Sequence, residues 1–528
     1  MTVETPAAVR DRGRSDFARV AQGAATSLAG KVLSIISGLV ITILLTRSLG
    51  VDQYGAIAVA VAIAGLVTGF TSLGLGNGAA RMMAHARGSG DTPGMMRVLK
   101  AGLLVGTVTG LVGTAVMLAL GATIFEGSGA ATTLVVMAPL VLASALRSVL
   151  SGLLRAYRDL KPLLILNVVR PIIDLALIGG LVVLGVRGVE AFAGGIVASA
   201  FLDLLLIVYF ARKGGRWGPL NDVSLIDAKA LLAFSLPLLV SQLLFIGIKS
   251  SDVFLLGALR SAAEAGLYSP VMRVAQSSTL FLAAFPLLFV PIATAYAAQR
   301  RMPQIQNLYV STTKWAYLLG FPVLIGLVAI PGEILPFLFG PGYENLDALA
   351  RILAIGYFVA LITGLNAVSL TAVGIVKPMA VYAAIGMVIN LGLGVVLIKA
   401  LGPTGAGWSN TVSIVFINVA YSIELFRRTQ VTPMRRDAVL LFLFSGLILL
   451  VTTLVAEGSD VHGSAAFAIA AAGVAVWLAG GLLLKPFSME WTDIKQMFAR
   501  RRGEPPSTTT DNGSVEVEGV LGADPSST

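Results

Sequence analysis

Ionisable side chains interrupt several long apolar segments of this sequence. They are Lys31, Arg147, Arg170, Asp174, Asp203, Lys249, Asp252 and Arg273. Five cations and three carboxylates leave a sum of +2. Charges in a hydrocarbon environment are costly, so they usually face a cavity or one another. Arginine stays charged and binds phosphate through two parallel hydrogen bonds. The set therefore predicts a cationic cavity that contacts an anion.

Spacing divides these residues into pairs and isolated charges. Arg170 and Asp174 lie four residues apart, and Lys249 and Asp252 lie three apart, so each pair shares a helix face. Two readings stay open for these pairs, because they either line the cavity or neutralise each other. Arg147 has no carboxylate at i±3 or i±4 on its own helix, which favours a role in anion contact.

The same reasoning applies to the other charges. Arg273 also lacks an acidic partner on its own helix, and we expect it to contact the anion. Lys31 belongs to the predicted cavity, although a lysine near a membrane surface also extends its amine toward the headgroups. Asp174, Asp203 and Asp252 are predicted to pair with cations or to serve a coupling ion.

The elements that position these charges are membrane-spanning helices. The 528 residues are 56% hydrophobic and 12% charged, with a mean hydropathy of +0.86. Crossing a bilayer takes about 20 apolar residues in a helix. An all-α polytopic protein of about fourteen helices is predicted, with spans near 27–48, 55–76, 98–122, 132–154, 163–185, 190–211, 231–258, 265–295, 312–338, 349–373, 379–401, 405–426, 437–456 and 464–484.

The loops between these spans predict the orientation. Alternate loops are rich in Lys and Arg, from Arg10–Arg19 at the start to Arg500–Arg502 near the end, whereas the intervening loops carry few basic residues. Cytoplasmic loops accumulate such residues. The alternation predicts an even number of helices and both termini in the cytoplasm.

Two similar passages suggest an internal repeat. Residues 49–55 (LGVDQYG) join the first two helices, and residues 259–268 (LRSAAEAGLY) join the seventh and eighth. Each is a short polar turn with an acidic residue, a glycine and a tyrosine. Their separation by six helices predicts two pseudo-symmetric six-helix lobes, a transporter feature, with two more helices at the C-terminal end.

The predicted divisions are a disordered basic segment 1–22, an N-lobe 23–216, a C-lobe 217–430, helices 13 and 14 in 431–486, and a disordered cytoplasmic tail 487–528.

Several function classes are disfavoured. The net charge of +10 is explained by the basic loops, so we expect no nucleic-acid partner. The chain has no cysteine and two histidines, both in predicted loops, so neither a metal site nor a cofactor is expected. No nucleophile–base spacing or phosphate-binding glycine loop is present, and we expect no enzyme activity.

Five ordered motifs carry a family resemblance. They are residues 46–55 (TRSLGVDQYG), 73–81 (LGLGNGAAR), 152–156 (GLLRA), 234–238 (FSLPL) with Asp252 downstream, and 266–268 (GLY). Their combination resembles the polysaccharide-export branch of the multidrug/oligosaccharidyl-lipid/polysaccharide flippase superfamily. The resemblance covers roughly residues 20–430.

That resemblance implies a V-shaped pair of lobes around a cationic cavity. It implies an undecaprenyl-pyrophosphate-linked oligosaccharide as substrate, flipped across the cytoplasmic membrane of a bacterium by alternating access. Arg147, Arg170 and Arg273 would face the pyrophosphate. The implied partners are membrane lipids and the glycosyltransferases and polymerase of a polysaccharide pathway. A cation-coupled efflux antiporter is the first alternative, and a membrane glycan ligase or polymerase is the second.

Overall fold

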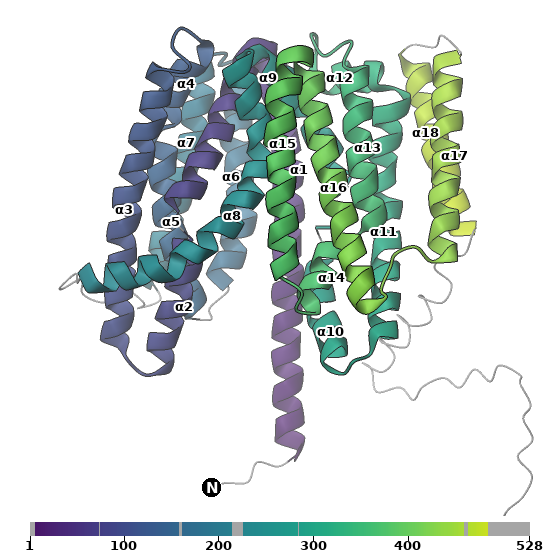
Figure 1. Cartoon of the computed structure of the whole chain (residues 1–528). Coiled ribbons are helices and arrows are strands. Elements are labelled where there is room, and N and C mark those ends of the chain that lie inside the picture. The colour runs from purple at the N-terminus through teal and green to yellow at the C-terminus, as the bar shows by residue number, and fades with distance from the viewer. Residues whose placement is uncertain are drawn as a thin grey trace, which may run out of the picture.

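The described part of the chain is a bundle of helices (Figure 1). The computed structural model describes residues 6–72, 74–157, 161–213, 225–283, 285–458 and 463–483. Side chains are described from Ala29 onward within these ranges, apart from residues 225–227, 234, 236–246, 248–249, 287–288, 437 and 482–483. Within these ranges every element is a helix, which confirms the all-α prediction.

The helices follow one another along the chain with short connections. They are α1 (Pro6–Thr71), α2 (Leu75–Gly88), α3 (Thr92–Ala122), α4 (Gly129–Met137), α5 (Pro139–Ala156), α6 (Lys161–Val183), α7 (Val189–Lys213), α8 (Leu225–Leu259), α9 (Ala262–Ser277), α10 (Pro286–Ala298), α11 (Met302–Ala329), α12 (Pro331–Phe339), α13 (Asp347–Thr363), α14 (Asn366–Ala372), α15 (Lys377–Leu401), α16 (Pro403–Thr429), α17 (Arg436–Gly458) and α18 (Ser464–Leu483).

Helix α1 reverses its direction at one glycine. Its 66 residues would extend about 99 Å if straight, more than three times the roughly 30 Å hydrocarbon thickness of a bilayer. Gly50 has φ 74° and ψ 179°, a conformation that glycine adopts readily. The chain rises to this kink and then descends toward α2 (Figure 1). Two of the predicted membrane helices are therefore the two arms of α1.

The described residues include eleven helical stretches that are long and apolar enough to cross a membrane. One of them, Ala29–Gly88, contains the reversal at Gly50 and so holds two predicted spans. The predicted spans at 231–258 and 265–295 are outside the eleven. The chain is a polytopic membrane protein, and the total of fourteen crossings stays a prediction.

Five predicted spans are interrupted, and one of them is the ninth, where α11 ends at Ala329 and α12 begins at Pro331. The second breaks between α1 and α2, where Gly74 has φ 66°, and the tenth breaks at Gly364, where φ is 60°. The fourth is divided at Pro139 and the eighth at Pro286, each of which opens a new helix. Such breaks are tolerated in membrane helices where neighbouring helices satisfy the backbone groups.

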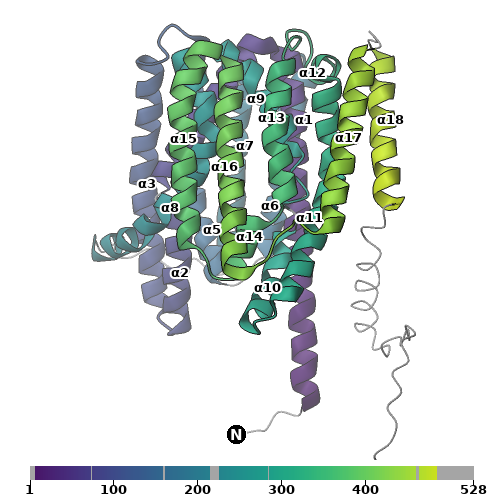
Figure 2. The same cartoon turned by 45° about the vertical axis from the view of Figure 1, so that its right-hand side comes forward.

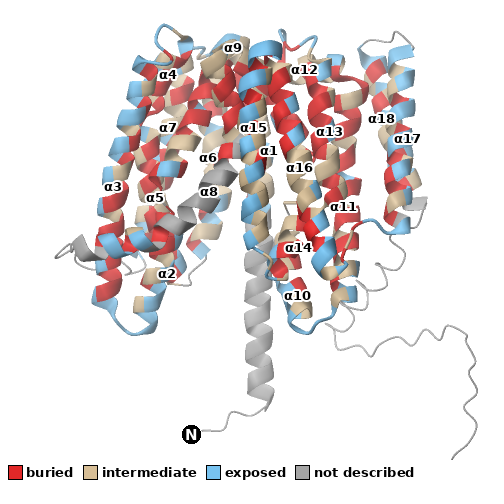
Figure 3. Cartoon of the chain, viewed as in Figure 1, coloured by how far each residue is buried: buried red, intermediate tan, exposed pale blue. Residues whose placement is uncertain are grey.

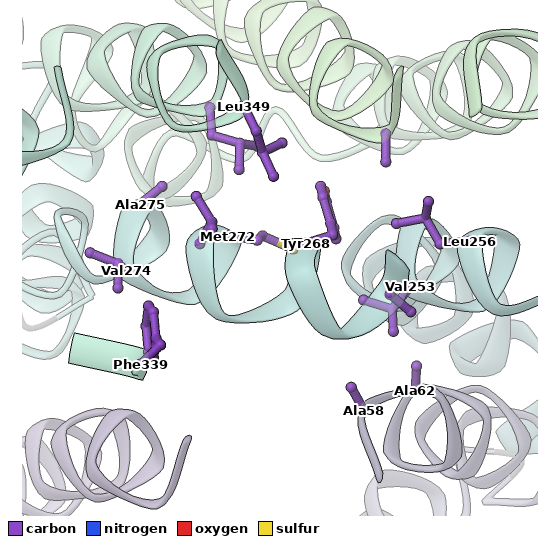
Figure 4. Close-up of a cluster of buried hydrophobic side chains, with 14 of the residues drawn as sticks. Ala58, Ala62, Val253, Leu256, Tyr268, Met272, Val274, Ala275, Phe339 and Leu349 are labelled. Carbon is purple, nitrogen blue, oxygen red and sulfur yellow. The ribbon is translucent and has the colours of Figure 1, made fainter. Parts of the chain in front are cut away.

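Helices α2 to α7 and α9 to α16 pack into two groups that α8 connects (Figures 1 and 2). The first part of α8 contacts α2 and α3, and Leu231 lies in one core with Leu99 and Val149. Its last part contacts α9 and α15. Ala58 and Ala62 of α1 face Val253 of α8 (Figure 4).

Exposed residues are frequent on the outward-facing sides of the helices (Figure 3), and many of them are large apolar residues, as a lipid-facing surface requires. The pair α17 and α18 stands at one edge and contacts α11 (Figure 2). The start of α1 and the end of α18 lie on the same side, which we name the inner face (Figure 1). The opposite side, with the kink at Gly50 and the start of α9, is the outer face. Helix α1 includes residues 6–22, for which composition predicts disorder, and the tail 487–528 lies outside the described residues.

Candidate functional site: an arginine pair and two buried aspartates

Two arginines converge on one buried aspartate inside the first helix group. Arg147 of α5 donates its Nε–H to Oδ2 of Asp203, which is on α7. Arg170 of α6 places Nη1 3.5 Å from the same oxygen. Asp203 is 1% exposed, whereas the side chains of Arg147 and Arg170 are 25% and 38% exposed. Both guanidinium groups thus reach open space from a buried carboxylate.

Asp174 adds a second carboxylate to this arrangement. It lies one helical turn from Arg170 on α6, with its Oδ2 3.9 Å from Nε of that arginine. The cluster of Arg147, Arg170, Asp174 and Asp203, which we name the arginine cluster, therefore contains two cations and two carboxylates. Ala143, Ser144 and Ala200, all with short side chains, line the narrow space beside Arg147, Arg170 and Asp203.

Hydrogen-bonding capacity is left over in this cluster. Among the described residues, Oδ1 of Asp203 has no hydrogen-bond partner although it is buried. In the same described part, no acceptor bonds to Nη1 or Nη2 of Arg147. Spare donors on a partly exposed guanidinium are suited to the oxygens of a phosphate.

A second buried carboxylate lies in the other helix group. Asp252 of α8 is fully buried and accepts three hydrogen bonds. The Tyr268 hydroxyl and the Asn410 amide donate to its Oδ2 at 3.0 and 2.7 Å, and the Asn390 amide donates to its Oδ1 at 3.0 Å. Ser251 donates to Oδ1 of Asn390 at 2.7 Å. We name these five residues the Asp252 cluster.

All three donors to Asp252 are neutral. Among the described side chains no ion pair includes Asp252, and the side chain of Lys249, its predicted partner, lies outside them. Oδ1 of Asn410 is buried without a partner among the described residues. A carboxylate oxygen and a spare amide oxygen are thus close together in the protein interior.

The remaining predicted cations lie on helices α1 and α9. Lys31 is exposed on α1, near the place where Gly30 packs against Asn167 of α6. Arg273 is exposed on α9, and its guanidinium lies against Gly38, where an added Cβ would be 3.2 Å from Nη1. In the described part of the chain no carboxylate forms an ion pair with Arg273. The structure does not bring these two cations into contact with the arginine cluster.

Sequence reasoning missed the partners that come from other helices. Asp203 pairs with Arg147 although the two are 56 residues apart, so spacing within one helix could not reveal the pair. Asn390 and Asn410 could have been singled out as amides within apolar segments. Tyr268 ends the repeated passage but carried no signal for a buried carboxylate.

Two of the sequence motifs meet at the break between α1 and α2. Arg155 donates to the carbonyl oxygen of Gly76 at 3.0 Å and to Oδ1 of Asn77 at 2.9 Å. An added Cβ at Gly152 would lie 2.8 Å from that carbonyl, so only a glycine fits there without a shift. The motifs at 73–81 and 152–156 thus form one contact that supports a broken helix.

Comparison with protein families identifies a relationship for this geometry. The sequence profile described as "Polysaccharide biosynthesis protein" matches residues 20–295, more than half of the 528 residues. The chain belongs to the polysaccharide biosynthesis protein family. Membership in this family confirms the resemblance drawn from the motifs. Among curated proteins, no sequence matches significantly.

Solved structures share the fold of this family member. Lipid II flippase MurJ, in an inward closed conformation, overlaps with a TM-score of 0.65 at 14% identity, over 90% of this chain and 99% of that chain. An inward-facing multidrug resistance MATE family transporter of the MOP superfamily gives 0.60 at 16% identity, over 83% and 100%. A MOP superfamily transporter from Pyrococcus furiosus, described as having reverse polarity of its binding pocket, gives 0.53 at 15% identity, over 77% and 95%.

Proposed function

We propose that this protein flips an undecaprenyl-pyrophosphate-linked oligosaccharide across the cytoplasmic membrane of a bacterium during the synthesis of a surface polysaccharide. Family membership supports the pathway. The arginine cluster is the observation that supports the substrate class, because Arg147 and Arg170 present two partly exposed guanidinium groups beside each other within a membrane protein. The pathway's glycosyltransferases and polymerase are the proposed partners.

The arginine cluster would bind the diphosphate by exchange of partners. Asp203 holds both guanidinium groups through one oxygen, which brings the two arginines together before a substrate arrives. The spare donors of Arg147 then meet the phosphate oxygens, and Arg–phosphate bonds are among the stronger charge-assisted hydrogen bonds. Arg273, at the contact between α9 and α1, together with Lys31 and Lys249, would meet the substrate along the remaining path.

We propose Asp252 as the residue that couples transport to an ion gradient. Asp174 and Asp203 pair with arginines, whereas the donors to Asp252 are neutral. Protonation of Asp252, or binding of a small cation beside the spare oxygen of Asn410, would change the hydrogen bonds between α8, α15 and α16. Asp252→Asn should abolish the dependence of transport on the ion gradient while the uncoupled exchange of substrate continues.

One observation favours a second candidate, cation-coupled efflux of small molecules. The fold resembles multidrug transporters, and a buried carboxylate such as Asp252 is compatible with cation exchange. The two functions differ in what the arginine cluster contributes. Its spare guanidinium donors suit the oxygens of a diphosphate, whereas its two carboxylates are already paired with arginines and offer no excess negative charge to a cationic compound.

Reconstitution tests the proposed function directly. The full-length protein is placed in liposomes with a fluorescent undecaprenyl-diphosphate oligosaccharide, and the fraction that crosses is measured by enzymatic release of the sugar outside. We expect transport by the wild type and its loss in Arg147→Gln with Arg170→Gln. Arg187→Gln, an exposed change outside the cluster, is the matched control. Transport of a cationic dye with no movement of the lipid-linked sugar would instead establish the efflux function.

A further inference from the structure

The hairpin of α2 and α3 carries a basic groove outside the arginine cluster. The groove has a volume of about 330 Å³ and is lined by Arg81, His85, Asp91 and Arg97, with Met82 and Val98 beside them. The two helices are antiparallel, joined by residues 89–91, and they project at the inner face (Figure 1).

Among the side chains that line this groove, positive charges outnumber negative ones. Arg81 and Arg97 contribute two positive charges, and Asp91 contributes one negative charge. Asp91 accepts the backbone N–H of Gly94 at 2.7 Å and so caps α3, and its other oxygen lies 3.6 Å from Nη2 of Arg97. His85 adds a further positive charge when protonated. The balance favours an anion at the groove.

An apolar stripe begins directly above the groove. Arg97 is followed on α3 by Leu104, Leu111 and Leu118, each seven residues after the last, so all four share one helix face. The three leucines are 41%, 53% and 41% exposed, which is the exposure of lipid-facing side chains. They span about 21 Å at 1.5 Å per residue, most of the roughly 30 Å of hydrocarbon in a bilayer.

The depth of the groove follows from the same spacing. Arg97 lies about 10 Å along the helix axis from Leu104, beyond the apolar stripe and at the level of the headgroups. A ligand that extends from the groove along α3 would therefore have an anionic head and hydrocarbon chains. Figure 1 places α3 at the outer edge of the bundle, away from the other helix group.

We propose that the α2–α3 groove binds the headgroup of an anionic phospholipid, whose acyl chains lie along Leu104, Leu111 and Leu118. Arg81 and Arg97 bind the phosphate from two helices, and the lipid fixes the hairpin to the inner leaflet. Basic side chains at an anionic membrane surface attract such headgroups, with each contributing about fivefold in affinity.

Binding of short-chain lipids to the full-length protein tests the proposal. Dioctanoyl phosphatidylglycerol is titrated into the protein in a neutral detergent, and bound lipid is counted by native mass spectrometry. Dioctanoyl phosphatidylcholine and glycerol 3-phosphate are the comparison ligands. We expect phosphatidylglycerol to bind in preference to both. Phosphatidylcholine lacks the net negative charge that the groove would bind, and glycerol 3-phosphate lacks the acyl chains that would contact the stripe.

Three variants establish where the lipid binds. Arg81→Gln with Arg97→Gln should weaken phosphatidylglycerol binding about thirty-fold, whereas both arginines changed to Lys should keep most of it. Asp91→Asn retains the helix cap and removes the opposing charge, so it should strengthen binding. Arg300→Gln with Arg301→Gln, at the corresponding α10–α11 turn, is the matched control.

Some outcomes would overturn the proposal. Equal phosphatidylglycerol binding by the wild type and the Arg81→Gln, Arg97→Gln protein would remove the groove as the site. Equal binding of glycerol 3-phosphate would identify a site for soluble anions, and equal binding of phosphatidylcholine would exclude charge selection. None of these results depends on transport activity.

Discussion

Asp203 is central to the arginine cluster because one of its oxygens serves two guanidinium groups. It is almost fully buried, while both arginines are partly exposed. Removing one member of a buried ion pair costs about 3–5 kcal/mol, since the other charge is left uncompensated. The carboxylate and the arginines should therefore differ in what their substitution does to stability and to transport.

A double-mutant cycle tests that difference. Asp203→Asn should lower the free energy of unfolding by about 3 kcal/mol, because two guanidinium groups then share a neutral partner. Arg147→Gln should abolish transport. The double variant should regain part of the lost stability and remain inactive. Thermal unfolding in detergent measures stability, and the liposome assay measures transport. A stability loss in the double variant equal to the sum of the two single losses would contradict the pairing.

The sequence predicted only part of this chemistry. Arg170 and Asp174 are four residues apart on one helix, so their proximity could be read directly. The pairing of Arg147 with Asp203 and the three donors to Asp252 depend on contacts between helices. Those contacts are fixed by packing, which a pattern along one helix does not contain.

At the scale of elements, the two repeated turns cross each other at the outer face. An added Cβ on Gly266 would lie 2.4 Å from the Val51 carbonyl oxygen and 2.9 Å from Gly55 Cα. One on Gly55 would lie 1.9 Å from the Ala262 carbonyl oxygen. The atoms nearest to each added Cβ are backbone atoms, so neither glycine tolerates a side chain without separation of α1 from α9.

Gly266→Val should therefore open the outer face. Overpacking costs about 1–3 kcal/mol, which is enough to shift a balance between two conformations toward the open one. The chain has no cysteine, so a single Ser269→Cys next to the crossing reports access to a maleimide reagent. We expect faster labelling in the Gly266→Val background than in Gly392→Val, a glycine with open space around it. Equal labelling rates would show that the crossing does not control access.

Helices α17 and α18 are attached through an aromatic cluster. Trp477 is fully buried, with its ring centroid 5.0 Å from that of Phe321 and 5.7 Å from that of Tyr317. Trp477→Ala should reduce stability by about 3–5 kcal/mol and release the α17–α18 pair. Limited proteolysis within 459–462 would detect the release. Trp408→Ala removes an exposed ring and should leave the digestion unchanged.

Hydropathy located these elements better than it located their interruptions. The helices after residue 377 begin within a few residues of the predicted spans, because lipid exposure produces long apolar runs. The breaks at Gly74 and Gly364 depend on backbone angles that an apolar average does not register. A side chain that bonds to the backbone beside such a break, such as Arg155 at the first one, comes from another helix.

At the scale of the whole molecule, the described chain begins and ends on one side (Figure 1). The basic loops predict that this inner face is cytoplasmic. Ser89 lies in the α2–α3 turn at the inner face, and Ser464 begins α18 at the outer face. In intact cells an impermeant maleimide should label Ser464→Cys and should label Ser89→Cys only after permeabilisation. The reverse pattern would invert the proposed orientation.

The leaflet distribution of lipid-linked oligosaccharides after depletion of this protein tests the central claim most directly. The proposed function predicts that undecaprenyl-pyrophosphate-linked sugar accumulates on the cytoplasmic side. Re-expression of the wild type should reverse this accumulation, and re-expression of Arg147→Gln should not. An unchanged distribution, with greater retention of small cationic compounds in the depleted cells, would contradict the flippase function and favour efflux.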